Sequence, residues 1–108
     1  MARAKEFREQ WNLAVFPDQA YAPLAAVVGD SLVLSWVNTH DVVVMPAPFS
    51  APGDCGKAKS GTPLPVYEAG GVSYSAVNFT QPGTFYAVCS VGMHCYFGQH
   101  QQITVTLL

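Results

Sequence analysis

The sequence predicts an all-β protein, folded as a β-sandwich of roughly seven to eight strands, and two observations support this. Runs of β-branched and aromatic residues recur along the chain, separated by Pro, Gly, Asn and Asp. Within several runs, residues two apart are apolar, which is the period of a strand with one buried face. A chain of 108 residues has the usual size of one domain, so we expect a single domain over residues 1–108.

The runs that we expect to be strands are, in chain order, 7–15, 25–28, 31–37, 42–45, 72–79, 84–89 and 102–108. In the first, Trp11, Leu13 and Val15 are spaced by two. The first ten residues carry the one helical alternative, through two glutamates and their basic neighbours. The third run is the clearest strand, because one face carries the large apolar side chains Leu32, Leu34 and Trp36.

Turn residues separate these strands. Gly29-Asp30 closes the second run, and Gln81-Pro82-Gly83 precedes the sixth. The fourth run stops at Pro46, because proline cannot donate to a sheet ladder. Segment 47–65 is rich in Pro, Gly, Ser and Lys, which predicts a long surface loop. In the fifth run, Tyr74 and Ala76 fall on one face.

Composition excludes several classes of protein. Half of the residues are hydrophobic and 11% are charged, which is typical of a globular chain. The net charge of −2 and the absence of a basic stripe give no reason to expect nucleic acid as a partner. The longest apolar run, 24–28, is far too short to cross a bilayer, so we expect no membrane span.

One loop carries the chemistry, and its sequence is Cys89-Ser90-Val91-Gly92-Met93-His94-Cys95-Tyr96-Phe97-Gly98-Gln99. It presents a thiolate, an imidazole and a carboxamide between two expected strands. Copper that cycles between two oxidation states needs such a mixed set. Thiolate favours Cu(I), imidazole suits both states, and the weak fourth ligand can be Met, Gln or a backbone oxygen.

A further nitrogen ligand is expected from elsewhere in the chain. His40 is the candidate, in Asn38-Thr39-His40-Asp41, at the corner between the strands over 31–37 and 42–45. His40 lies far from the loop in sequence, as a ligand from a neighbouring strand of a sandwich would. The alternative for His40 is a turn histidine with no ligand role.

These residues resemble the phytocyanin branch of the cupredoxins, and most closely the stellacyanin type. The matching segments are Val28-Gly29-Asp30, His40 with its acidic neighbour and following valines, Gly83-Thr84-Phe85-Tyr86 before Cys89, His94-Cys95 and Gly98-Gln99. The C-x4-H-x4-Q spacing, with a second Cys directly after the His, is specific to that branch. The resemblance implies a Greek-key sandwich and a type 1 copper site formed by His40, Cys89 and His94, with Gln99 as axial ligand.

Several of these assignments have alternatives. Gln99 could be an ordinary residue at the start of a strand, and Met93 and Met45 are rival axial donors, since a thioether is the usual choice. Cys55 and Cys95 are expected to form a disulfide. The alternative is two free thiols in a reducing cell.

The expected disulfide bears on location, because disulfides persist in oxidising compartments. Residues 1–10 are charged and no apolar segment of a signal peptide follows them. Either the protein is intracellular, or targeting and anchoring segments have been removed from a mature form. The cysteines favour the second option, so we expect an extracytoplasmic location.

The leading functional hypothesis is single-electron transfer by a monomeric blue copper protein that is not an enzyme. Its partner would be a redox protein or a small redox molecule, docking near His94. Met93, Tyr96 and Phe97 could form an apolar rim there, or they could simply pack. Two alternatives remain, a copper storage or delivery protein and a structural zinc domain that uses Cys55, Cys89, Cys95 and a histidine.

Overall fold

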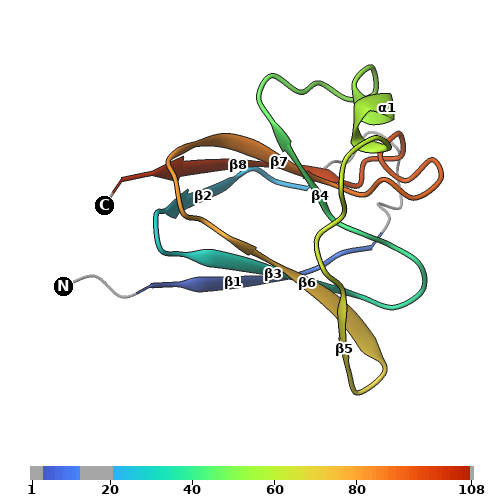
Figure 1. Cartoon of the computed structure of the whole chain (residues 1–108), viewed down its shortest axis with the longest axis horizontal. Helices are drawn as coiled ribbons and strands as arrows, with labels where there is room; N and C mark the ends of the chain where they lie inside the picture. Colours follow the sequence, from blue (N-terminus) through green and yellow to red (C-terminus); the bar gives the residue numbers. More distant parts are fainter. Residues whose placement is uncertain (1–3, 13–20, 108) are drawn as a thin grey trace.

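The computed structural model describes residues 4–12 and 21–107, which form eight strands and one short helix (Figure 1). The elements are β1 (Glu6–Gln10), β2 (Leu24–Val27), β3 (Ser31–Trp36), β4 (Val43–Pro46), α1 (Cys55–Ala58), β5 (Tyr67–Ala69), β6 (Val72–Asn78), β7 (Gly83–Val88) and β8 (His100–Thr106). This confirms the prediction of an all-β fold with the expected number of strands.

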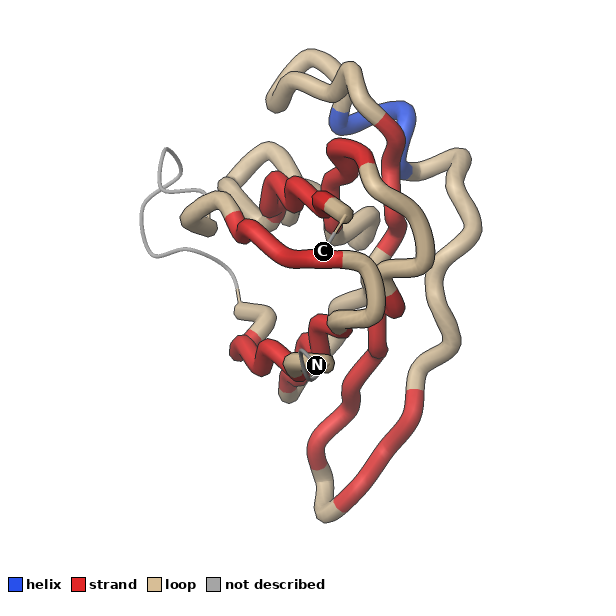
Figure 2. The backbone as a smooth tube through the Cα atoms, turned by 90° about the vertical axis from the view of Figure 1, so that its left-hand side faces the viewer, coloured by secondary structure: helices blue, strands red, loops and turns tan. Residues whose placement is uncertain are grey.

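The strands form two sheets of four, which lie one above the other as the layers of a sandwich (Figure 2). One sheet has the order β1-β3-β6-β5 and the other has the order β2-β8-β7-β4. The pairs β1–β3 and β2–β8 are parallel, whereas the remaining pairs are antiparallel. The chain crosses repeatedly between the sheets, including after β2, β3, β4 and β6, so residues distant in sequence meet at the ends of the sandwich.

The main core lies between the sheets and follows the period of two predicted for the third strand. Leu32 and Leu34 are fully buried and Trp36 is 3% exposed. Their neighbours in the core come from both layers and include Trp11, Val77, Phe79, Ala87, Ile103 and Val105. A second, smaller cluster lies beneath α1 and contains Phe49, Cys55, Ala58, Val88 and Cys95. This second cluster joins the long middle loop to the end of the sandwich that carries the cysteine–histidine loop.

The first ten residues confirm the start of the strand predicted over 7–15 and exclude the helical alternative. Residues 6–10 form a strand and not a helix, because they pair in parallel with β3 from Glu6 opposite Ser31 to Gln10 opposite Ser35. Charged residues tolerate this position since β1 is an edge strand with one exposed face. The strand also ends at Gln10, earlier than expected, and the part of the predicted strand over 13–15 lies outside the described residues.

Two short elements were not expected from the sequence. β5 has only three residues, all exposed, so no hydrophobic alternation indicates it. It pairs with β6 through a hairpin at Gly70-Gly71, where both glycines have positive φ, and this hairpin forms the lowest part of the molecule in Figures 1 and 2. The predicted loop over 47–65 contains α1, a single helical turn.

The side chains of β6 face the core in the phase opposite to Tyr74 and Ala76. Ser75 and Val77 are buried, whereas Tyr74 lies on the outer face and stacks against Tyr67 with ring centroids 5.5 Å apart. Tyr74 and Ala76 therefore lie on the outer face of the sheet and not in the core. Among the residues that the structure describes, no helix has the length and apolar character needed to cross a membrane.

Candidate metal centre

Strand pairing explains why distant donors meet at one end of the sandwich. In the β4–β7 ladder, Val43 at the start of β4 lies opposite Val88 at the end of β7. Because the pair is antiparallel, the residues before β4 continue alongside the residues after β7. His40 precedes β4 and Cys89 follows β7, so the register of this ladder brings the two together.

A second ladder positions the last predicted donor. In the β7–β8 pair, Val88 lies opposite His100, and the backbone N–H of Cys89 donates to the carbonyl of Gln99 at 3.1 Å. Cys89 and Gln99 therefore face each other across the base of the loop. His94 lies midway along that loop, between the two residues that this hydrogen bond joins.

The side chains of His40, Cys89 and His94 converge, with one possible ligand atom from each lying within 4.8 Å of the others. Nδ1 of His40 is 3.1 Å from Nδ1 of His94, and Sγ of Cys89 is 3.4 Å from the His94 nitrogen and 3.8 Å from the His40 nitrogen. Facing nitrogens at that distance can share one proton at most, so at least one lone pair remains. The group therefore offers nitrogen and sulfur donors to a single point.

Burial controls the protonation of this group. Cys89 is fully buried, and desolvation raises the pKa of its thiol to about 11. At neutral pH the thiol therefore keeps its proton unless a cation displaces it. Burial also lowers the pKa of His40, as does the neighbouring His94, so a neutral imidazole is favoured there.

Gln99 is the least satisfied polar side chain at this end of the molecule. It is fully buried, and neither its amide oxygen nor its amide nitrogen has a hydrogen-bond partner. The amide lies near His40 and raises the pKa of that imidazole, an effect smaller than the lowering by burial and by His94. Buried polar groups are rarely left unpaired, because each costs free energy. An unpaired amide beside a thiol and two imidazoles is what a further ligand would look like.

The rival axial donors occupy different places. Met45 lies on β4 and packs against the second cluster, beneath α1. Met93 is 53% exposed on the loop. Of these candidates, Gln99 is the one whose polar atoms are buried without partners.

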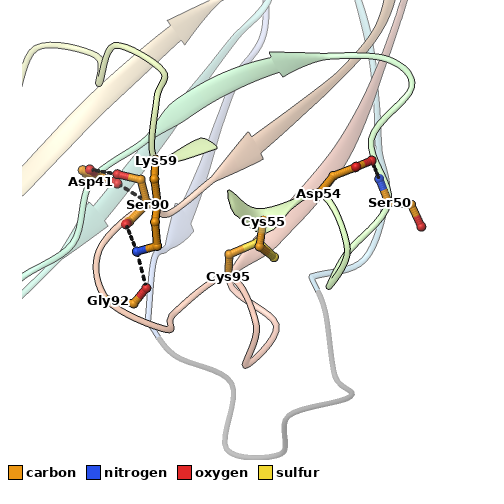
Figure 3. The surroundings of a disulfide bond; sticks show 8 residues. All are labelled: Asp41, Ser50, Asp54, Cys55, Lys59, Ser90, Gly92 and Cys95. Atoms are coloured by element: carbon orange, nitrogen blue, oxygen red, sulfur yellow. Dashed lines mark hydrogen bonds between the residues drawn. A yellow bond between two sulfur atoms is a disulfide. The ribbon is translucent and has the colours of Figure 1, made fainter. Parts of the chain in front are cut away.

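Asp41 and Ser90 lock the residues that follow His40 and Cys89. The Asp41 carboxylate accepts hydrogen bonds from the backbone N–H of Ser90 at 2.7 Å and from its hydroxyl at 2.5 Å (Figure 3). The carbonyl of Asp41 accepts a hydrogen bond from the indole Nε1–H of the buried Trp11 at 2.8 Å. These roles of Asp41 and Ser90 were not predicted from the sequence, where the one available signal is the position of Asp41 directly after His40.

Cys55 and Cys95 form a disulfide, which confirms the pairing expected from the sequence (Figure 3). The surrounding backbone is a series of turns, since Phe97 and Gln99 both donate to the carbonyl of His94. Gly98 permits this path with a φ of 103°. The disulfide also removes two thiols from the predicted zinc set, because a disulfide sulfur is not a thiolate ligand. Cys89 is the free cysteine.

The predicted apolar rim divides into two groups. Met93 and Phe97 are exposed, at 53% and 44%, on either side of His94 in the sequence. Tyr96 is half-buried and packs against the second cluster. The exposed pair gives the outer surface of the loop an apolar character, and their role in docking stays a prediction.

Comparisons with known proteins place the fold. No protein-family model matches the sequence, and no curated protein sequence matches it. Cucumber stellacyanin in its Cu²⁺ form is similar in structure, with a TM-score of 0.60, 22% identity, and 91% of this chain covering 87% of that one. Auracyanin B has a TM-score of 0.59 and 18% identity, with 98% of this chain covering 91% of that one.

Rusticyanin from Thiobacillus ferrooxidans is also similar, with a TM-score of 0.56 and 17% identity over 97% of this chain and 79% of that one. These proteins are cupredoxins. The likeness shows that this chain has the cupredoxin β-sandwich fold, and the His-Cys-His group lies at one end of it.

Proposed function

We propose that this cupredoxin-fold chain is a type 1 (blue) copper protein that carries single electrons. His40, Cys89 and His94 would hold the metal, and Gln99 would be its weak fourth ligand. The observation that carries this proposal is the convergence of two imidazoles and a buried thiol within 4.8 Å of one another. The unpaired amide of Gln99 beside them fits the same centre.

The chemistry of this donor set suits copper in both oxidation states. Nitrogen ligands with one thiolate and one weak ligand are the arrangement of blue copper sites. Bound there, copper would supply a centre that gains and loses one electron. The Asp41–Ser90 hydrogen bonds hold the backbone next to His40 and Cys89. These two donors would therefore keep their positions when bound copper changes its oxidation state.

The donors would also exclude substrate, which is why we propose a carrier and not an enzyme. A catalytic metal site keeps a position open, whereas the side chains of His40, Cys89, His94 and Gln99 would together leave none. Cys89 and Gln99 are fully buried, which blocks direct access from that side. The same burial disfavours storage or delivery, because an exchangeable ion needs an open route.

Electrons would enter and leave beside His94. Met93 and Phe97 flank it on the exposed surface of the loop and would form the docking patch, with Tyr96 supporting it from below. The partner would be a redox protein or a small redox molecule. We place the protein outside the cytoplasm, because the Cys55–Cys95 disulfide is stable in an oxidising compartment.

A visible spectrum tests the proposal. Purified protein given one equivalent of Cu(II) should develop an intense red-region absorption band that disappears on reduction and returns on oxidation. The Cys89→Ser variant should show no such band, because the thiolate is the source of the colour. Protein that stays colourless and redox-silent with Cu(II) contradicts the proposal. A coloured protein that loses copper to a chelator within seconds would favour delivery.

A further inference from the structure

Lys59 makes two hydrogen bonds to the loop that connects Cys89 with His94. Its Nζ donates to the carbonyl of Gly92 at 2.6 Å and to the carbonyl of Ser90 at 3.1 Å (Figure 3). The two residues are more than thirty positions away in sequence. A lysine ammonium has three donors and no acceptor, so one side chain can bind two carbonyls at once. The loop is thereby attached to the segment that follows α1.

The same segment is attached to the loop a second time. Cys55 begins α1, and its disulfide with Cys95 holds the residue directly after His94 (Figure 3). Lys59 directly follows α1 and holds the stretch before His94. His94 therefore lies between two attachments to one short segment, one a covalent bond and the other a pair of hydrogen bonds.

Ser90 is held from two sides. Its N–H and hydroxyl bind the Asp41 carboxylate, and its carbonyl accepts from the Lys59 ammonium. The two peptide groups that flank the Cα of Ser90 are thus each held by a charged side chain. Removing the lysine would leave the carbonyls of Ser90 and Gly92 without this donor.

We propose that Lys59 is a positioning residue of the metal centre, which fixes the path of the loop between Cys89 and His94. This inference rests on the proposed function. Lys59 would not touch the metal, and it acts through the backbone of Ser90 and Gly92. The side chain is a specific anchor and not a general surface charge.

Lys57 provides a matched control on the same segment. Its ammonium lies 3.1 Å from the carboxylate of Asp54, and its side chain is 68% exposed. Asp54 in turn closes the preceding turn by accepting from the backbone N–H of Ser50 (Figure 3). Lys57→Met and Lys59→Met therefore remove the same charge from the same segment, but only the second removes contacts to the ligand loop.

The first measurement uses copper-free protein. The backbone N–H of His94 donates to the carbonyl of Val91 at 3.0 Å, so its hydrogen exchange reports on the closed loop. Lys59→Met should speed that exchange by roughly three- to tenfold, an effect reduced by the exposure of the lysine. Lys57→Met should leave it unchanged, and Lys59→Arg should restore most of the protection. Equal exchange in Lys59→Met and Lys57→Met overturns the proposal.

The second measurement uses copper-loaded protein and separates positioning from simple anchoring. Lys59→Met should lower the reduction potential by more than Lys57→Met does, and it should change the electron paramagnetic resonance spectrum of the Cu(II) form. Faster exchange with an unchanged potential and spectrum would overturn the positioning role. Should Lys59→Met not fold, Lys59→Gln is compared with Lys57→Gln in the same two assays. Wild-type protein that stays colourless with Cu(II) defeats the proposed function, whereas the exchange data still test the anchor.

Discussion

The two ends of the sandwich treat buried polar side chains in opposite ways. At the end near the chain termini, Asp30 precedes β3 and is 5% exposed. Its carboxylate accepts from the backbone N–H groups of Lys5 at 2.8 Å and Val27 at 3.0 Å. Its own N–H donates to Val27, and its carbonyl accepts from Phe79. Every polar group of Asp30 therefore has a partner within the fold.

At the other end, beyond the last residue of β3, the buried amide of Gln99 has no partner. Beside it, the side chains of His40, Cys89 and His94 face one another. Cys89 and Gln99 are fully buried and the two histidines are partly buried, and the Gln99 amide lacks the hydrogen bonds that Asp30 has. Asp30 thus serves the fold through its hydrogen bonds, whereas Gln99 and the His-Cys-His group remain available to a ligand. This second end of the sandwich, called the open end below, therefore needs other support, which the Cys55–Cys95 disulfide and the hydrogen bonds of Lys59 supply.

Removing the disulfide tests that dependence and should have the largest effect on stability. The Cys55→Ala/Cys95→Ala variant opens a link between residues 40 apart in sequence. In the chain-entropy model, that loss lowers the free energy of unfolding by about 4 kcal/mol. Denaturant unfolding of copper-free protein measures it. A loss below about 1 kcal/mol would show that the open end stands without the link.

Asp41 is the part of the open end that is fully hydrogen-bonded, so its loss should also destabilise. Asp41→Ala leaves the half-buried N–H of Ser90 without its partner and should cost about 1–3 kcal/mol in copper-free protein. Asp41→Asn keeps an acceptor for that N–H and should cost less. In copper-loaded protein Asp41→Asn should raise the reduction potential, because a negative charge near the site is removed. Equal losses in the two variants would contradict the role of the hydrogen bond.

Removing the amide of Gln99 should have the opposite effect on stability, because this amide makes no hydrogen bond that could be lost. Gln99→Leu should stabilise the copper-free protein by about 1–2 kcal/mol, since it replaces an unsatisfied buried amide with an apolar group of similar size. Gln101 is the matched control. It is also buried and its amide oxygen is also unpaired, but its amide nitrogen donates to Glu9 and to the carbonyl of Ala22, so Gln101→Leu should destabilise. Similar effects of the two substitutions would show that the missing hydrogen bonds of Gln99 do not decide its effect on stability.

The same position provides a test in the copper-loaded protein. A thioether favours Cu(I) more than an amide oxygen does, so Gln99→Met should raise the reduction potential. Cyclic voltammetry of wild type and variant measures the change. An unchanged or lower potential would remove Gln99 from the ligand set.

Asp30 gives the smallest effect, confined to acid. Hydrogen bonds from Val27 and Lys5 hold the pKa of its carboxyl below the ordinary value of 3.8. A carboxyl with a lowered folded pKa contributes stability that is complete above about pH 4 and is lost as pH falls through the folded value. Asp30→Asn should therefore flatten the fall of stability below pH 4. An unchanged acid profile would show that these bonds matter little to the carboxylate form.

The strand pattern and the donors of the loop could be read from the sequence because both are local. Alternation over Leu32, Leu34 and Trp36 reflects the pleat of one strand. Cys89, His94 and Gln99 lie within one loop between two strands, so their proximity needs no knowledge of distant contacts. β5 was missed because three exposed residues carry no periodicity, and the helical alternative failed because an edge strand can carry charges.

The sequence by itself determined which chemical groups the protein offers, since residue type decides what a side chain can bind. Only the tertiary structure decided which of them meet. His40 reaches Cys89 through the register of β4 against β7, and Lys59 reaches the carbonyls of Ser90 and Gly92 from a distant loop. Contacts of this kind depend on how separate strands pair and pack. The unpaired state of Gln99 likewise appears only when all of its neighbours are in place.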